Sequence, residues 1–111
     1  MWVFTESGFV SAVRHREDMS KLIVRARDAK SLEQLARLAS AQIAKTPNAD
    51  YPYRMVVSNE DFKLWNDLNV ECLDYPNFKS HIAITRGEKY LDALSIVWII
   101  MHEVEDEGVR L

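Results

Sequence analysis

Apolar residues in the first half of the chain follow the short, alternating runs that are typical of strands. Residues 2–5 and 9–13 are rich in aromatic and β-branched side chains and flank Glu6-Ser7-Gly8, a short connection with glycine where a turn needs it. Residues 22–27 and 51–57 have the same character. The pattern therefore predicts a hairpin followed by two further strands.

The rest of the chain has apolar residues every three or four positions, which is the spacing of one helix face. Three such stretches each follow a polar start signal with the form of a cap, at residues 31–34, 58–61 and 85–88. We expect a helix from each signal, the last one ending at about residue 105. Residues 42–45 are a candidate short strand, and residues 74–84 are expected to form a linking loop.

The predicted order is strand-strand-strand-helix-strand-strand-helix-helix. This order indicates an α+β fold, with an antiparallel sheet of about five strands and helices packed on one face. A ferredoxin-like core with the first hairpin appended is the alternative. The length of 111 residues and the hydrophobic content of 48% fit a single domain over residues 1–111. The residues expected to be largely buried are Trp2, Val24, Tyr53, Phe62, Trp65, Leu94 and Trp98.

Arginines occur in the predicted strands between apolar residues. Successive side chains of a strand point to opposite faces, so Arg25 and Arg27 share one face and Val24 lies on the other. If helices cover the apolar face, the arginines project from the open one, and two residues of the predicted loop lie at its border. The predicted ligand-binding residues are Arg14, Arg25, Arg27, Arg54, Tyr75 and Lys79.

Guanidinium groups on a rigid sheet beside aromatic side chains suit phosphate groups and stacked bases. The predicted function is a small non-enzymatic binding module for an anionic ligand, either nucleic acid or an acidic protein segment. The net charge is −3, so any attraction to nucleic acid must come from a local basic face. The competing interpretation is that the arginines pair with acids and solvate the sheet, the candidates being Glu17, Asp28, Asp50 and Asp74.

The tripeptide Asp-Tyr-Pro occurs twice, at residues 50–52 and 74–76, with different flanks that favour two separate turns over a repeat. The chain also contains Met1-Trp2-Val3-Phe4-Thr5, Gly8-Phe9, Val24-Arg25-Ala26-Arg27, Tyr90 and Trp98. With these motifs it resembles a family of short uncharacterised proteins of actinobacteria and their phages. The resemblance covers nearly the whole chain. It implies a single-domain protein of unassigned activity, sometimes carried on mobile elements, and it carries over no catalytic residue.

Sequence signals for catalysis and metal binding are poor. His102-Glu103 begins like a zinc-protease helix, but no second histidine follows four residues on. The single cysteine, Cys72, excludes an internal disulfide and a cysteine-based zinc cage, and it is expected to be a small core residue. No cofactor and no metal are expected. An enzyme is still an alternative, because catalytic groups assemble in space rather than in sequence.

The chain shows no sequence feature of a membrane protein. Its longest apolar run, residues 96–101, is far short of the roughly 20 residues needed to span a bilayer. No basic region precedes an apolar run at the N-terminus, so no signal peptide is visible. We expect a cytoplasmic protein without membrane contact.

The predicted last helix is apolar over more than one face. A helix packed on a sheet needs an apolar stripe only about 100° wide, which a stripe through Trp98 provides. Ile96, Ile99 and Ile100 lie beside that stripe. Either residues 74–84 cover these isoleucines or a second copy of the helix does, in a two-fold homodimer.

The acidic C-terminal part offers a second class of function. Acids outnumber bases after residue 70, and Glu103, Glu105, Asp106 and Glu107 follow the last apolar stretch. Such a group can present a negative patch to a basic partner. The alternative prediction is therefore a protein-interaction factor or phage-type inhibitor that acts through this acidic surface.

Overall fold

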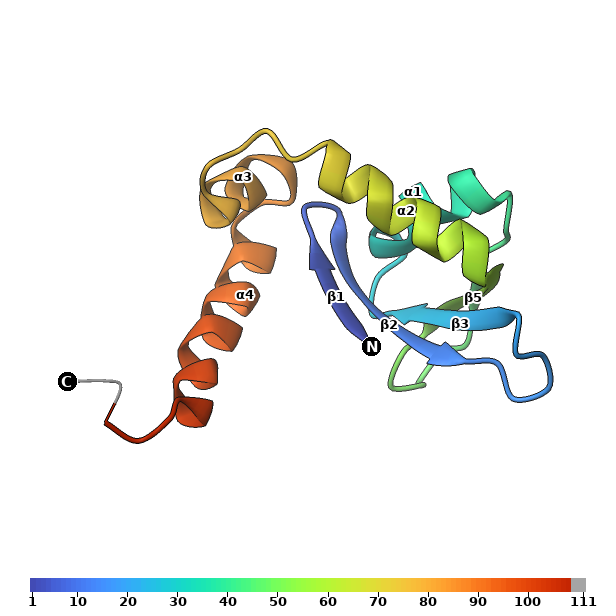
Figure 1. Ribbon diagram of the computed structural model, residues 1–111, viewed down its shortest axis with the longest axis horizontal. Helices are drawn as coiled ribbons and strands as arrows, with labels where there is room; N and C mark the ends of the chain where they lie inside the picture. The colour runs from blue at the N-terminus through green and yellow to red at the C-terminus, as the bar shows by residue number, and fades with distance from the viewer. Residues whose placement is uncertain (109–111) are drawn as a thin grey trace. The chain divides into compact units, whose positions relative to one another are not determined.

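A computed structural model describes residues 1–108, which form five strands, four α-helices and a short 3₁₀ helix (Figure 1). The strands are β1 (Trp2–Thr5), β2 (Gly8–Arg14), β3 (Lys21–Ala26), β4 (Ala44–Lys45) and β5 (Tyr53–Ser58). The helices are α1 (Lys30–Ala39), α2 (Asn59–Glu71), α3 (Phe78–Thr85), α4 (Glu88–Ile100) and the 3₁₀ helix η1 (Met101–Val104).

The five strands form one antiparallel sheet in the order β1-β2-β3-β5-β4, which confirms the predicted α+β class. β3 and β4 lie on either side of β5, and the chain passes between them through α1. This arrangement is a split β-α-β unit, the central element of the ferredoxin-like alternative, and the hairpin of β1 and β2 extends it beyond β3. Helices α1 and α2 pack on one face of this sheet (Figure 1).

The main hydrophobic core lies between the sheet and these two helices. Strands β2, β3 and β5 contribute every second residue to it, as the alternation of side chains requires. The buried members are Val10, Ala12, Val24, Ala26, Leu32, Leu35, Met55, Val57, Phe62 and Trp65. The prediction of burial is confirmed for Val24, Phe62 and Trp65, while Tyr53 is half-buried against the same core.

Two predicted core tryptophans are instead exposed. Trp2 is 68% exposed because it lies opposite Ser11 in the hairpin register, on the sheet face away from α1 and α2. Trp98 is 57% exposed in α4, a helix with no buried residue, and Leu94 of the same helix is only half-buried. Hydrophobicity was thus a poor guide to burial at both ends of the chain.

The helix starts differ from the predicted caps at two of three places. The amide of Asp61 donates to the Ser58 hydroxyl at 3.0 Å, which confirms the start of α2. The amide of Ser31 instead donates to Asp28 at 3.1 Å, so an earlier side chain caps α1. Thr85 donates to a carbonyl in its own helix, and α4 begins after Gly87, whose φ of 88° suits glycine.

The expected loop over residues 74–84 is wrong, because most of it belongs to α3. Asn77 is the N-cap of this helix, and its side chain accepts a hydrogen bond from the Ser80 amide at 3.2 Å. Asparagine is among the preferred N-cap residues, and it follows Pro76 directly. The cap was therefore present in the sequence but was interpreted as part of a turn.

The chain divides into two compact units, Met1–Asp74 and Tyr75–Leu111. The first contains the sheet, α1, α2 and the whole of the main core. In the second, α3 packs against α4, and Ile82 is its one buried hydrophobic residue within the described range. The single domain over residues 1–111 stays a prediction.

We expect a fragment of residues 1–74 to fold without the rest of the chain, because it contains every residue of the main core. The fragment should unfold cooperatively on heating, measured by far- and near-ultraviolet circular dichroism. Leu35→Ala should lower its free energy of unfolding by about 2–5 kcal/mol, as large-to-small changes in a packed core do. A fragment without a cooperative transition would show that the two units fold as one domain.

Candidate ligand-binding face

The charged residues of the five strands are all basic. They are Arg14, Lys21, Arg25, Lys45 and Arg54, and no strand contains an aspartate or glutamate. The sheet therefore has a local positive charge although the whole chain is acidic. The register of the strands decides which of these cations share a face.

Arg25 of β3 lies directly opposite Arg54 of β5, and Ser11 of β2 lies opposite Arg25 on its other side. Their strand neighbours Val24 and Met55 are buried under the helices. Arg25 and Arg54 therefore point to the outer face of the sheet, which we define as the face away from α1 and α2. Like charges directly opposite each other on neighbouring strands are destabilising, so this pair costs the free protein stability.

The two guanidinium groups have few partners in the protein. Arg25 donates from Nη2 to the Ser11 hydroxyl at 2.8 Å, and its guanidinium carbon lies 4.5 Å from the centre of the Tyr51 ring. The Nε atoms of Arg25 and Arg54 are buried without a hydrogen-bond partner. Within residues 1–108 no carboxylate forms an ion pair with either side chain. Most N–H groups of the two guanidiniums therefore donate no hydrogen bond to another group of the protein.

Arg27 follows the end of β3 and has an acidic partner. It forms an ion pair with Asp50 at 3.3 Å, and both side chains are largely exposed. Its guanidinium carbon also lies 4.9 Å from the centre of the Tyr51 ring. For this arginine the competing interpretation, pairing with an acid, is confirmed. An exposed ion pair of this kind contributes only about 0–1 kcal/mol, so an anionic ligand can displace Asp50 at little cost.

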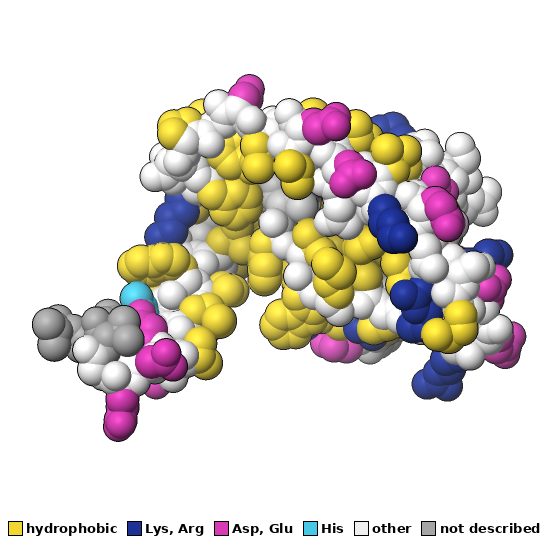
Figure 2. Space-filling view, in the orientation of Figure 1, with side chains coloured by type: hydrophobic (Ala, Val, Ile, Leu, Met, Phe, Trp, Pro, Cys, Tyr) yellow, Lys and Arg dark blue, Asp and Glu magenta, His cyan; other side chains and the backbone are white. Residues whose placement is uncertain are grey.

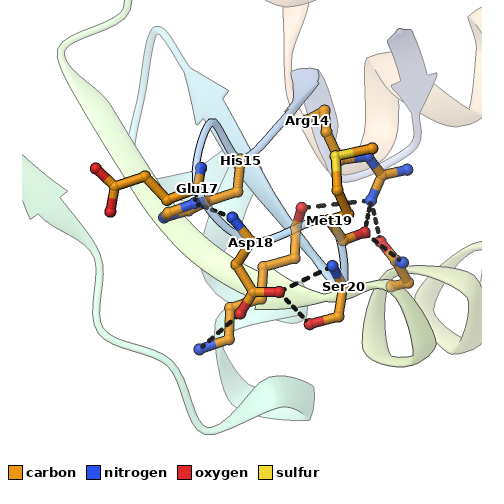
Figure 3. Close-up of polar contacts among 8 residues, drawn as sticks. Arg14, His15, Glu17, Asp18, Met19 and Ser20 are labelled. Carbon is orange, nitrogen blue, oxygen red and sulfur yellow. Dashed lines mark hydrogen bonds and ion pairs between the residues drawn. The ribbon is translucent and has the colours of Figure 1, made fainter.

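Arg14 does not belong to the outer face, contrary to its predicted placement, and its role in ligand binding stays a prediction. It lies two residues beyond Ala12, whose side chain is buried beneath the helices. Its Nη1 donates to the carbonyls of Met19 at 3.1 Å and Lys21 at 3.3 Å, and to Oδ1 of Asn59 at the start of α2 (Figure 3). Arg14 therefore joins the β2–β3 connection to α2.

The β2–β3 connection is organised by its own polar groups (Figure 3). Asp18 accepts hydrogen bonds from the hydroxyl and the amide of Ser20, and these bonds hold the pKa of the Asp18 carboxyl below its ordinary value. His15 accepts from the amides of Glu17 and Asp18 through Nδ1, at 3.2 Å each. These contacts account for the shape of the turn.

Tyr75 and Lys79 lie in the second unit, apart from the sequence segment that carries the arginines. The Tyr75 ring stacks on His81, with centroids 4.2 Å apart and planes 14° apart. The Lys79 ammonium lies 4.2 Å from the centre of the Trp98 ring. Within this unit, both side chains thus have aromatic contacts of their own.

Aromatic residues on the outer face were missed by the sequence analysis. Phe4 lies opposite Phe9 in the hairpin, and their rings stack with centroids 4.6 Å apart. Trp2 meets Phe9 edge to face at 5.6 Å, and Phe9 lies 6.5 Å from Tyr51. The row of rings therefore leads from the edge strand β1 to the ring that Arg25 covers.

We call the combined surface the aromatic–arginine face. Its residues are Trp2, Phe4, Phe9, Tyr51, Arg25, Arg27 and Arg54. The signal that could have found it is the hairpin register, which places Trp2 across from Ser11 and therefore on the side of Arg25.

Two hollows accompany the arginines. One of about 390 Å³ lies beside Arg54, where Ile23, Ala44 and Val56 form part of its wall. The other, of about 680 Å³, includes Arg14 together with Met1, Leu22, Phe62 and Asn66. Both are lined mainly by apolar groups, and only the first contains a residue of the aromatic–arginine face.

No metal site is formed within residues 1–108, where no three His, Cys, Asp or Glu side chains come close enough to hold an ion. Cys72 is exposed at the end of α2, so its prediction as a core residue is wrong. Among these residues, no helix has the length and apolar content needed to cross a bilayer.

The predicted acidic surface follows α4. Glu103, Glu105, Asp106 and Glu107 are all exposed, and acidic side chains gather near this end of the chain in Figure 2. Glu105 forms an ion pair with His102. The group is accessible, and its partner stays a prediction.

Comparison with known protein families, curated proteins and solved structures finds no match for this chain. The resemblance to short proteins of actinobacteria and their phages stays a prediction. The function of the protein must therefore be inferred from the geometry of the aromatic–arginine face.

Proposed function

We propose that this protein is a small binding module that holds an anionic ligand on the aromatic–arginine face, through Arg25 and Arg54. The observation that carries the proposal is the pair of residues Arg25 and Arg54, which lie opposite each other in neighbouring strands, half-buried and without a carboxylate partner in the described part of the chain. Two unpaired like charges side by side are unfavourable in the free protein. An anion bound at this pair of residues reduces the repulsion and accepts hydrogen bonds from the guanidinium groups.

The geometry suits phosphate or carboxylate oxygens. A guanidinium group presents five N–H donors in a planar fork, which matches the two oxygens of either group. The Ser11 hydroxyl and the Tyr51 ring already orient Arg25, so binding orders little that was mobile before. Arg27 lies over the same ring and adds a third cation when its exposed pair with Asp50 opens.

We expect the chain to bind labelled polyanions with an affinity that falls as salt rises, measured by fluorescence anisotropy with oligonucleotides and with polyglutamate. Arg25→Gln and Arg54→Gln should each weaken binding about tenfold or more, because each removes charged hydrogen bonds. For oligonucleotides, each should also reduce the salt dependence by about one released counterion.

Arg14→Gln is the matched control, because Arg14 lies on the opposite face of the sheet. It should lower stability but leave the affinity unchanged. Arg54→Gln should not lower the thermal midpoint of the free protein, since it removes a like-charge contact. Binding that is absent at low salt, or equal losses for Arg14→Gln and Arg54→Gln, would contradict the proposal.

The second proposal concerns assembly through α4. Ile96, Ile99 and Ile100 are 65%, 59% and 59% exposed, and Figure 2 shows hydrophobic side chains along this helix. The alternative that residues 74–84 cover them is wrong. In that segment Ile82 is buried but Ile84 is 84% exposed, and the three isoleucines stay uncovered.

We propose that a second copy of α4 covers these isoleucines in a two-fold homodimer. A helix with apolar residues on all sides is normally buried, yet no residue of α4 is buried in the single chain. A two-fold dimer needs only this one self-complementary surface.

Light scattering at micromolar concentration should therefore give twice the mass of one chain. Ile99→Glu should yield a soluble, folded monomer, because it places a charge in the contact between the helices. Ile84→Glu makes the same change at an exposed position of α3 and should leave the dimer intact. A wild-type monomer would refute this assembly.

A further inference from the structure

We infer that the anionic ligand is single-stranded nucleic acid, with bases stacked on Trp2 and Phe4 and phosphates held by Arg25 and Arg54. This inference rests on the proposed function and adds the class of ligand. It is carried by one row of residues across the sheet: Trp2 lies opposite Ser11, Ser11 opposite Arg25, and Arg25 opposite Arg54.

The row places a stacking surface and two cations at a fixed spacing. Neighbouring strands are about 4.8 Å apart, so Trp2 of β1 and Arg25 of β3 are separated by roughly 10 Å across the sheet. Each nucleotide carries one base and one phosphate, and neighbouring phosphates of a single strand are closer together than Trp2 and Arg25 are. A few nucleotides lying across the strands can therefore reach both ends of the row.

Trp2 and Phe4 are exposed enough to accept bases. Trp2 is 68% exposed and Phe4 is 36% exposed, and both belong to the outer face. Phe9, on the neighbouring strand β2, contacts both rings, stacked on Phe4 and edge to face with Trp2. The two rings are thus held in place before a ligand arrives, which limits the entropy lost on binding.

The same observations disfavour the other polyanions. In a duplex the bases are already stacked on each other, so they cannot use Trp2 or Phe4. The carboxylate side chains of an acidic peptide can pair with Arg25 and Arg54 but offer no ring that stacks on Trp2. Single-stranded nucleic acid uses both halves of the aromatic–arginine face, and each stacked base contributes substantially to affinity in a sequence-tolerant way.

The test uses the full chain with labelled single strands of about eight nucleotides, a length within the usual range for one small domain. Comparison of DNA and RNA strands of the same sequence shows which of the two nucleic acids the protein prefers. Single strands should bind about tenfold or more tightly than the matching duplex or polyglutamate. Binding should also quench tryptophan fluorescence, and Trp2→Phe should remove most of that quenching.

The matched variants are Trp2→Leu, which keeps an apolar side chain without a stacking surface, and Trp2→Phe, which keeps a ring. Trp2→Leu should weaken single-strand binding about 5- to 150-fold, the effect expected for one lost base stack, and Trp2→Phe should weaken it less. Phe4→Leu gives an independent second measurement. Neither leucine variant should change the affinity for polyglutamate, which also shows that the fold is intact.

The outcomes separate this inference from the proposed function. If Trp2→Leu and Phe4→Leu bind single strands as the wild type does, base stacking is refuted, while sensitivity to Arg25→Gln and Arg54→Gln upholds the anion site. If polyglutamate or duplex binds as tightly as single strands, the ligand class is wrong. If no polyanion binds at low salt, both the inference and the proposed function fail.

Discussion

Burial of one side of the sheet under α1 and α2 determines the direction of every strand side chain in this protein. Val24 and Met55 are buried beneath the helices, so Arg25 and Arg54 can only point the other way. A shift of either strand by one residue would place the guanidinium groups in the core and expose the apolar side chains. The core and the candidate site are therefore two consequences of the same register.

The outer face combines groups that are unfavourable for a free domain. Facing arginines repel, and exposed aromatic rings leave apolar area in water. Small domains tolerate such groups where they serve binding, because the ligand then supplies the missing contacts. The packing of Leu32, Leu35 and Trp65 against the opposite side of the sheet offsets this cost. Stability and the proposed recognition of a ligand thus depend on opposite faces of the sheet.

Strand alternation was the most informative part of the sequence. The order of strands and helices predicted the antiparallel sheet, and alternation within the strands placed Arg25 and Arg54 on the open face. The same rule applied to β2 would have placed Arg14 with Ala12 under the helices, but arginine was assumed to face solvent. Trp2 was misplaced for the opposite reason, since a large apolar residue was assumed to be buried. Both placements are wrong because they follow from the polarity of the residue and not from its position in the strand register.

Other features could not be predicted from short stretches of sequence, because they depend on how distant parts of the chain pack together. The N-cap role of Asn77 was hidden by Pro76 and by the turn-like phrase around it. Burial along α4 could not be inferred from its composition, because an apolar helix has the same sequence whether its own chain or another covers it. To predict the row from Trp2 to Arg54, the registers of three strand pairs must all be known, and the sequence of no single strand determines them.

The anion site proposed at Arg25 and Arg54 would also link the folding of this protein to the ions around it. Any anion that binds the folded state but not the unfolded chain raises stability in proportion to the logarithm of its concentration. Under the proposed function, phosphate or sulfate in a buffer would bind at Arg25 and Arg54, whereas chloride at equal ionic strength would only screen the two charges. The melting temperature of the protein would then depend on which anion is present, so a comparison of buffers would also compare candidate ligands.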